Sequence, residues 1–578
     1  MLICAPLVGV WLEFPAGGLR RLFYSDAMLL LAFRSALLRL PAAHFALAFG
    51  AAALVAGCAT DPGDGAPATI EAPASTTTTE ASAATTTTRA RASTTPGVDE
   101  LDAPGVGVPV PLSDRDFESC GLTECATVEV PIDPAEPELG TIDIAIRVLR
   151  SSSPEARLGY LFVNPGGPGQ PGQWMATEAS SLFRSELLGA FDIVAFDPRG
   201  VGASQPDLGC GGRDALSEQT DRVASRVDTP DEILALETAV ALCAEETGPA
   251  AGYLGTEFVA HDMDAIRQAL GAEQISYYGA SYGSVLGGFY ATLYPESVRA
   301  MVVDGALNPI DEIGTQEERT AADSEQLIAF EALLSEALAS CDSADCPIYN
   351  DGDPTGYYLD AMAKIDLVNE ERPNLDNAGL MGVISYLYSE DGWPELHSAL
   401  FALAQNDDPS ALAQSSDRQA SDSDINERDW VLCLDGWSLS PEIDRETRLG
   451  DVDAFAAEYE ATAPLLAAPL TDTYYSGFGD TILCPFLDTI APEPLDIPFD
   501  GADVPILVIG NPSDPATPFT ESVELVEDTL SNGYLLEADH PAHVVYVTGG
   551  NDCVDDIVHQ VLIDTEFPDD RRVVCERL

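Results

Sequence analysis

Basic residues are scarce in this sequence. It has 27 lysine and arginine residues against 96 aspartate and glutamate residues, a formal net charge of −69 at pH 7, and Lys364 is its one lysine. A surface this negative repels the phosphates of nucleic acids, so nucleic-acid binding is excluded. The carboxylates indicate a strongly hydrated acidic shell that keeps the protein soluble in salty surroundings, while an acidic funnel for cationic substrates would give the same count.

Patterns of metal ligands are scarce as well. The sequence has six histidines, no Cys-x-x-Cys pair and no histidine-rich cluster, so we predict neither a metal site nor a cofactor. Twelve cysteines do occur, of which Cys4 and Cys58 precede the folded part. The other ten form an even set in a chain with an export signal, which predicts five disulfides. We expect nearest neighbours to pair, as Cys120–Cys125, Cys210–Cys243, Cys341–Cys346, Cys433–Cys484 and Cys553–Cys575.

The N-terminus lacks an apolar run long enough for a bilayer span, which needs about 20 residues. Arg34 and Arg39 precede a shorter apolar stretch, residues 42–57, which ends in the Val-Ala-Gly-Cys sequence Val55–Cys58. This pattern is typical of a bacterial lipoprotein signal spanning residues 1–58, with Cys58 as the acylated residue. We therefore expect an exported protein held by lipid on the outer face of the cell membrane, or released from it. A plain transmembrane anchor is the alternative.

Residues 59–107 form a segment of low complexity. Threonine, alanine, serine and proline dominate it, including the runs Thr76–Thr79 and Thr85–Thr88. Such a composition has too few large apolar side chains to offset the entropy of ordering the chain. We expect a disordered tether that holds the folded part away from the membrane.

Short apolar runs ended by glycine- or proline-bearing turns occur in the rest of the chain. They lie at residues 160–163, 192–196, 275–278, 300–303, 506–509 and 534–538. Runs without alternation are typical of strands buried on both faces of a parallel sheet. Helical patterns lie between them, for example Phe258–Leu270. The sequence therefore predicts an α/β fold with a mostly parallel, doubly wound sheet.

The strand signals stop between residues 306 and 498. Amphipathic helical patterns replace them, such as Ser324–Ala339, and the sheet pattern resumes at Val504. A mainly helical block that interrupts a sheet pattern indicates a cap inserted into the core domain. We predict a core made of residues 108–305 and 499–578, with a helical cap at 306–498.

The sharpest motif is Gly279-Ala280-Ser281-Tyr282-Gly283. It follows the predicted strand 275–278 and precedes a helical run, Val285–Leu293. This is the strand–turn–helix context of a nucleophile elbow, in which the glycines permit a sharp turn. Ser281 is therefore predicted to be the nucleophile of a serine hydrolase.

A second motif, Asn164–Gly169, directly follows the strand 160–163. Taken alone it is a flexible loop, but at this strand end it can present backbone N–H groups toward Ser281. Proline has no N–H, so Gly166 or Gly167 is expected to form the oxyanion hole with the N–H of Tyr282.

The base should be a histidine downstream of the last strands. Of the five histidines after the signal, His261 precedes the nucleophile, His397 lies in the cap and His559 lies in a helical pattern near the C-terminus. His540 and His543 remain, both in the loop after the last predicted strand. We predict His543, with His540 as the alternative.

The acid that orients the base should follow the preceding strand. Ile506–Ile509 leads into Gly510–Pro518, where Asp514 stands between prolines. Asp514 is predicted to accept the imidazole N–H, although a turn-forming aspartate is the alternative. The chain order Ser281, Asp514, His543 is that of the α/β-hydrolase fold.

Several motifs together resemble a known family. They are Asn164–Gly169, Asp197–Ser204, Tyr278–Gly283, Asp514–Pro518 and the stretch from His543 to Cys575 with Asn551–Asp555. They look like those of secreted actinobacterial tripeptidyl aminopeptidases, relatives of proline iminopeptidase, and the resemblance covers about residues 108–578. It implies a triad peptidase with a C-terminal domain typical of that branch, and it favours His543 as the base.

The resemblance implies an exported exopeptidase that acts on peptides with free N-termini. The alternative is a carboxylesterase or lipase, because the same triad cleaves esters. A non-catalytic surface module is a third possibility. For the substrate ammonium we expect a carboxylate in the cap, Asp435, held by the neighbouring Cys433 and walled by Trp430 and Trp437. A surface acid is the alternative for Asp435.

Overall fold

The computed structural model describes residues 9–14, 18–23, 109–113, 115–208, 230–310, 316–369, 375–416, 427–435, 461–467, 487, 497–549 and 551–576. Most of the predicted signal, with Cys58, and the whole predicted tether lie outside these ranges, as do Cys210, Cys484 and Trp437. Residues 1–88 form a unit of their own. The described part of that unit is an antiparallel pair of strands, β1 (Gly9–Phe14) and β2 (Gly18–Phe23).

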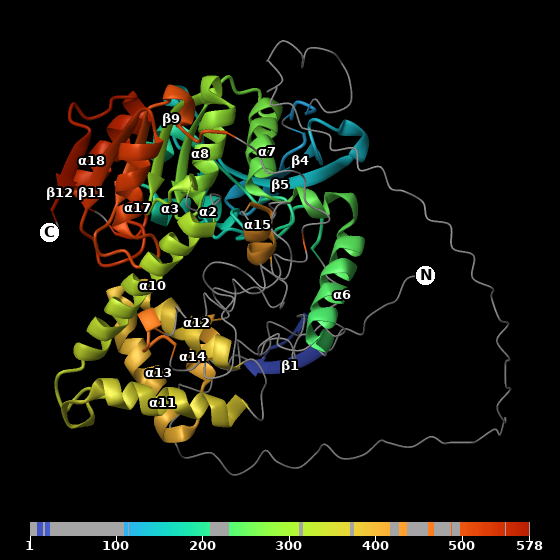
Figure 1. Cartoon of the computed structure of the whole chain (residues 1–578). Coiled ribbons are helices and arrows are strands. Elements are labelled where there is room, and N and C mark those ends of the chain that lie inside the picture. Colours follow the sequence, from blue (N-terminus) through green and yellow to red (C-terminus); the bar gives the residue numbers. More distant parts are fainter. Residues whose placement is uncertain are drawn as a thin grey trace, which may run out of the picture. The chain divides into compact units, whose positions relative to one another are not determined.

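Residues 89–578 form the second unit, which contains a ten-stranded sheet in the order β12-β11-β10-β9-β8-β6-β7-β5-β4-β3. The strands from β12 to β7 run parallel (Figure 1). The six predicted strands are confirmed as β6 (Gly159–Asn164), β7 (Phe191–Phe196), β8 (Ile275–Ala280), β9 (Val298–Asp304), β10 (Ile506–Gly510) and β11 (Gly533–Ala538). Every residue of β7, β8 and β10 is buried, as expected for strands covered on both faces.

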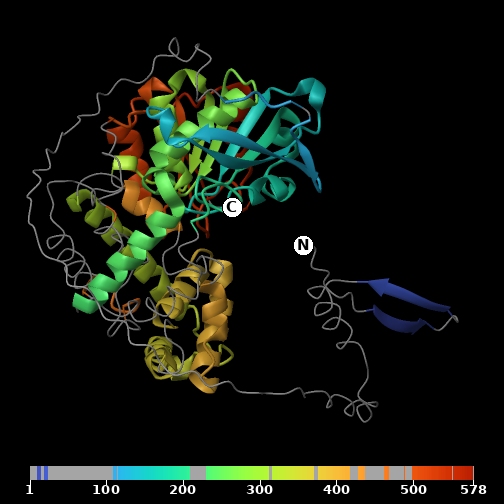
Figure 2. The same ribbon diagram turned by 90° about the vertical axis from the view of Figure 1, so that its right-hand side faces the viewer.

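The other four strands were not predicted. They are β3 (Glu118–Cys120), β4 (Thr123–Pro131) and β5 (Thr141–Leu149), which form an antiparallel edge (Figure 2), and β12 (Arg572–Cys575) at the opposite edge. In β5 buried and partly exposed residues alternate, because one face of this strand packs on the core while the other does not. The sequence of β5 carries this alternation, which a search for continuous apolar runs misses.

Helices cover both faces of the sheet. The apolar cluster on one face includes side chains of α7 (Thr256–Ala269) and α8 (Gly283–Leu293). The cluster on the other face includes side chains of α2 (Trp174–Thr177), α4 (Ser185–Ala190) and α18 (Asp552–His559). Two-sided coverage explains why the strands between them are mostly apolar.

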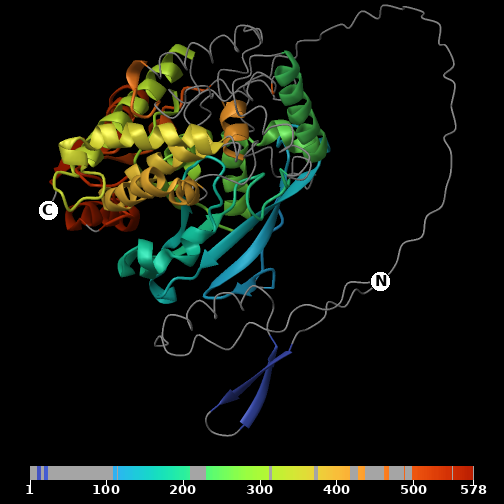
Figure 3. The ribbon, with the colours of Figure 1, turned by 90° about the horizontal axis from the view of Figure 1, so that it is seen from below.

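Helices occupy the described part of the chain between β9 and β10, and no strand occurs there. They are α10 (Gln316–Ala339), α11 (Pro354–Asn369), α12 (Leu375–Leu387), α13 (Trp393–Asn406), α14 (Ser410–Ser416) and α15 (Glu427–Asp435). Helices α10 to α14 share an apolar cluster of their own, and Figures 1 and 3 show α11, α12, α13 and α14 packed together. Among the described residues, no helix is both long and apolar enough to cross a bilayer.

Three of the five predicted disulfides are present as predicted. They join Cys120 to Cys125, Cys341 to Cys346 and Cys553 to Cys575. Cys243 and Cys433 are also disulfide-bonded. Their predicted partners lie outside the described residues, so these two pairings stay predictions.

Candidate active site

Ser281 stands at the turn between β8 and α8. Its φ of 55° lies in the left-handed region that a residue with a side chain rarely adopts. The surrounding bonds hold this conformation: the Ser281 N–H donates to the Asp304 carbonyl at 2.8 Å, and its own carbonyl accepts the Ser284 hydroxyl at 2.6 Å. A strained residue held this firmly at a strand–helix turn is the geometry of a nucleophile elbow.

The glycines around the elbow allow the close approach of neighbouring backbone. A Cβ on Gly279 would lie 2.3 Å from the Gly283 carbonyl oxygen. A Cβ on Gly166 would lie 2.5 Å from the Ala280 oxygen and 2.9 Å from the Tyr282 nitrogen. The loop after β6 therefore lies directly against the elbow, as the oxyanion prediction requires.

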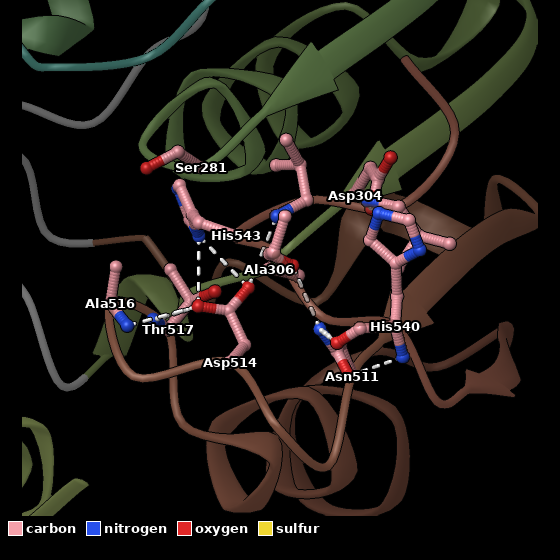
Figure 4. Close-up of polar contacts among 12 residues, drawn as sticks. Ser281, Asp304, Ala306, Asn511, Asp514, Ala516, Thr517, His540 and His543 are labelled. Carbon is pink, nitrogen blue, oxygen red and sulfur yellow. Dashed lines mark hydrogen bonds and ion pairs between the residues drawn. The ribbon is translucent and has the colours of Figure 1, made fainter. Parts of the chain in front are cut away.

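The predicted acid and base are in contact. The Nδ1 atom of His543 lies 2.9 and 2.8 Å from the two carboxylate oxygens of Asp514. The Asp514 side chain is fully buried, and it also accepts the backbone N–H groups of Ala516, Thr517 and Val544. In the view of Figure 4 the imidazole lies between Ser281 and this carboxylate. Since Nδ1 faces Asp514, Nε2 is the ring atom available to take a proton from the serine hydroxyl.

His540, the alternative base, has different partners. Its Nε2 atom lies 3.0 Å from the Thr548 hydroxyl, and in Figure 4 its ring lies on the far side of Asn511 from Asp514. Asn511 itself joins the two loops: its Nδ2 donates to the carbonyls of His540 and Ala542 at 2.9 Å each, and its Oδ1 accepts the N–H groups of Ser513 and His540. Asn511 was not predicted from the sequence, although its place just after a predicted strand is a detectable signal.

The two glycines considered for the oxyanion hole differ in their bonding. The Gly166 N–H donates to the side-chain oxygen of Asn164 at 2.8 Å. That bond occupies the donor, so Gly166 does not fit the predicted role. In the described part of the chain no hydrogen bond is made by the Gly167 N–H. The arrangement therefore favours Gly167 and Tyr282 as the pair of donors.

A second buried carboxylate, Asp304, lies close to the pair. It accepts the Tyr278 hydroxyl at 2.8 Å and the N–H groups of Val545 and Tyr546 at 2.9 and 2.8 Å. Burial raises the pKa of Asp304 to about 6, although these three donors act in the opposite direction. Asp304 thus anchors the loop that carries His543, a role that was not predicted from the sequence.

The electrostatics favour a charged state of the base. Burial lowers the pKa of His543, but the charge and hydrogen bond of Asp514 and the charge of Asp304 outweigh it, so the pKa is raised above its ordinary value of 6.5. An imidazolium next to two carboxylates is the state that forms when the base has taken the serine proton.

Asp435, the predicted amine-binding residue, lies beside the elbow. One of its carboxylate oxygens accepts the hydroxyl of Tyr282 at 2.6 Å, and the other accepts the Thr256 N–H at 2.6 Å. Of the two tryptophans predicted to wall this site, Trp430 is described and Trp437 lies outside the described residues. Trp430 is fully buried and donates its indole N–H to the Ala251 carbonyl at 2.9 Å, so it supports α15 from within the core.

The motif Asp197–Ser204 stabilises the fold through its arginine. Arg199 is fully buried and pairs with Asp262 through two bonds of 2.8 and 2.7 Å. It also donates to three backbone carbonyls. This network ties the loop after β7 to α7, and it lies outside the triad.

One group of potential metal ligands occurs among the described residues, Cys341, Cys346 and His397. The two cysteines are joined in a disulfide, which offers no thiolate to a metal. The His397 Nε2 atom lies 2.7 Å from the Ala337 carbonyl. The group therefore serves as a structural link within the cap.

Comparisons with known proteins agree with this geometry. Residues 160–344 match the family described as alpha/beta hydrolase fold, and residues 476–575 match the family described as TAP-like protein. The chain is 30% identical over 499 residues to "Serine protease Hip1" of Mycobacterium tuberculosis, covering 81% of this chain and 90% of the relative.

Two further relatives carry different activities in their names. "Carboxylesterase B" of Mycobacterium tuberculosis is 30% identical over 504 residues, which cover 80% of this chain and 90% of that protein. "Tripeptidyl aminopeptidase" of Streptomyces lividans is 29% identical over 496 residues, which cover 80% of this chain and 86% of that protein. With the elbow, the buried acid–base pair and these relatives established, the chain belongs to the α/β hydrolases with a TAP-like C-terminal region, and it is a serine hydrolase of that family.

Proposed function

We propose that the protein is an exported serine aminopeptidase that releases tripeptides or other short peptides from free N-termini. The observation that carries this proposal is the bond between Asp435 and the hydroxyl of Tyr282, the residue next to the nucleophile. This bond places the Asp435 carboxylate in direct contact with the side chain that neighbours Ser281 in the sequence. A carboxylate there can pair with the substrate ammonium and so select chain ends over internal peptide bonds.

The catalytic residues in this proposal are Ser281, His543 and Asp514. The Ser281 hydroxyl attacks the scissile carbonyl while His543 Nε2 takes its proton, and Asp514 stabilises the imidazolium through Nδ1. The N–H groups of Gly167 and Tyr282 stabilise the oxyanion. The imidazolium then protonates the leaving amine as the C–N bond breaks, which leaves an acyl-enzyme. A water, deprotonated by His543, hydrolyses the ester and regenerates the serine.

The distance from Asp435 to the scissile bond would set the length of the released peptide. Two of the carboxylate's lone-pair sites are used by Thr256 and Tyr282. A carboxylate accepts up to about four hydrogen bonds, so an ammonium can bind it without displacing these two donors. A substrate α-amino group has a pKa of about 7.7–8.0, so it is largely charged at neutral pH.

An esterase activity is the second candidate. The relative named "Carboxylesterase B" is as similar to this chain as the relative named "Serine protease Hip1", at 30% identity each. The triad, oxyanion donors and acyl-enzyme would be the same for an ester. The two candidates differ in whether a free ammonium on the substrate matters.

We further propose that the enzyme is attached to the outer face of the cell membrane by lipid at Cys58. The support for this is the sequence Val55–Cys58, which is typical of a bacterial lipoprotein signal, and the low-complexity segment after it. Replacing Cys58 with serine should release the enzyme from membranes or block its processing. Unchanged membrane retention of Cys58→Ser would point to a transmembrane anchor instead.

The test of substrate class compares matched p-nitroanilide peptides with free and N-acetylated N-termini, beside p-nitrophenyl esters. An aminopeptidase should lose at least about tenfold in kcat/KM on acetylation, since the pairing of ammonium with carboxylate is lost. A series with one, two and three residues before the scissile bond would give the length of the released peptide.

Three variants assign the effect to its residues. Asp435→Asn should harm the free peptide more than the acetylated one, whereas Glu395→Gln, an exposed acid on α13, should change neither. Tyr282→Phe keeps the backbone N–H but removes the bond to Asp435, so it should give part of the Asp435→Asn effect. Equal turnover of free and acetylated peptides by the wild-type enzyme would rule out the aminopeptidase and leave an esterase or endopeptidase.

A further inference from the structure

The loop that carries His543 is bonded to the cap as well as to the core. The Glu390 N–H donates to the Pro541 carbonyl at 2.9 Å, and the His543 N–H donates to the Tyr388 carbonyl at 2.8 Å. Between these bonds Ser389 and Ala542 form an antiparallel bridge. The cap segment Tyr388–Glu390, which we call the cap clamp, thus pairs with the residues just before the base as a short strand would.

The side chain of Tyr388 also contacts the base. Its ring meets the His543 imidazole edge-on, with centroids 5.3 Å apart and planes at 84°. On its other side the Tyr388 ring packs against Phe330 of α10, with centroids 5.7 Å apart. Burial raises the pKa of Tyr388 to about 12, so the ring stays neutral beside the imidazole over the range in which the base titrates. The imidazole is therefore backed by an aromatic ring that the cap core fixes in place.

The loop that carries Asp514, between β10 and α17 (Phe519–Glu524), is held by the cap in a similar way. The Gln326 side-chain amide of α10 donates to the Ala516 carbonyl. The Ala516 side chain is itself a member of the apolar cluster shared by the cap helices. Ala516 stands two residues from Asp514 and donates its N–H to that carboxylate at 2.9 Å. Both members of the acid–base pair therefore lie on loops that contact the cap.

From the core side, the loop that carries His543 is held by three side chains, one of which is Asp514, whose carboxylate accepts the Val544 N–H at 3.2 Å. Asn511 binds the carbonyls of His540 and Ala542, and Asp304 binds the N–H groups of Val545 and Tyr546. None of these bonds is made by a backbone atom of His543 itself. The one backbone bond from the His543 N–H that the described structure contains goes to the cap, at Tyr388.

We propose that the cap clamp is a positioning element of the catalytic base: it fixes the backbone and ring plane of His543, so the inserted cap completes the triad. This rests on the assignment of Ser281, Asp514 and His543 as the triad, and it does not depend on whether the substrate is a peptide or an ester. Weakening the clamp should misdirect Nε2 and lower kcat while leaving KM nearly unchanged, because the residues that bind the substrate stay in place.

Glu390→Pro is the sharpest variant for a test. Glu390 is the first residue of a short 3-10 helix, a position at which proline is well tolerated. The preceding Ser389 has φ −155° and ψ 141°, the extended conformation that proline favours in its predecessor. Proline therefore fits its own helix, but it removes the N–H that binds Pro541, and its ring pushes that carbonyl away. Glu390→Ala is the matched control, because it removes the same carboxylate and keeps the N–H.

We would measure kcat and KM on a p-nitrophenyl ester, the second-order rate of Ser281 labelling by a fluorophosphonate as a function of pH, and the thermal midpoint. Relative to Glu390→Ala, we expect Glu390→Pro to lower kcat and the labelling rate at least about tenfold, with KM within about twofold. Tyr388→Leu should lower the labelling rate and move the pH midpoint of labelling, whereas Tyr388→Phe should keep both.

Two results would overturn the proposal. The first is a labelling rate for Glu390→Pro equal to that of Glu390→Ala at an equal thermal midpoint. The second is a Tyr388→Leu enzyme whose labelling rate and pH midpoint of labelling equal those of the wild type. This second result decides the question if Glu390→Pro folds poorly. His543→Ala separates this from the triad assignment: if it keeps the wild-type labelling rate, the triad is wrong. If it is inactive while the clamp variants are normal, the clamp alone is wrong.

Discussion

At the scale of single residues, the site depends on how carboxylates surround one histidine. Asp514 contacts the ring of His543 directly, and the charge of Asp304 acts on it from the end of β9. A histidine whose pKa is raised on folding stabilises the protein at low pH, and this contribution is lost as the pH rises through the raised value. Catalysis has the opposite dependence, because the base must be neutral. Activity should therefore appear over the pH range in which this stabilisation disappears.

The pH dependence of kcat/KM tests this arrangement. We expect the acidic limb to have its midpoint above about 6.5, the ordinary pKa of histidine. Asp304→Asn should move that midpoint to lower pH, because it removes one of the negative charges that favour the imidazolium. Asp570→Asn, an exposed acid before β12, is the control and should leave the midpoint in place. A midpoint for Asp304→Asn at or above the wild-type value would show that Asp304 does not act on the base.

At the scale of elements, the turn between β8 and α8 needs the loop after β6 to lie against it. Gly166 makes this possible, since its φ of +92° is strained for other residues and any Cβ would press on Ala280 and Tyr282. The same contact brings the backbone of the loop to the place where the oxyanion forms. One missing Cβ thus links the loop to the catalytic turn.

Gly166→Ala should therefore damage catalysis more than folding. We expect it to lower kcat/KM and the rate of fluorophosphonate labelling at least about 100-fold, because displacements of about 1 Å at reacting groups have effects of that size. Gly189→Ala in α4 is the matched control: its φ is not positive, and its nearest contact would be an ordinary 3.5 Å. A Gly166→Ala enzyme with full labelling would show that the loop can shift without affecting the oxyanion hole.

At the scale of the whole molecule, the net charge of −69 is the dominant physical feature. Mutual repulsion of like charges destabilises a compact state, and salt screens it over a Debye length that falls from about 30 Å at 0.01 M to about 3 Å at 1 M. We expect the thermal midpoint to rise by several degrees over this range of sodium chloride. Tetramethylammonium chloride at equal ionic strength should raise the thermal midpoint by the same amount if charge screening is the cause. A midpoint independent of salt would contradict this account of the acidic shell.

Local patterns in the sequence determined much of the fold and the prediction of Ser281 as the nucleophile. The strands 192–196, 275–278 and 506–509 were predictable because burial on both faces favours mostly apolar runs without polar alternation. The family fold could likewise be predicted from the order of the motifs. The antiparallel strand β5 was missed because its alternating pattern is weaker than an apolar run.

The tertiary structure alone decided which of several equivalent residues occupy the site. His540 and His543 are three residues apart in the same loop, and only the packing of that loop shows that His543 faces Asp514. Gly166 and Gly167 were equally suited until the Asn164 side chain was seen to bind the first of them. The cap clamp joins residues about 150 positions apart, at Tyr388–Glu390 and Pro541–His543. Such contacts are set by the docking of whole elements, which leaves no local periodicity in the sequence.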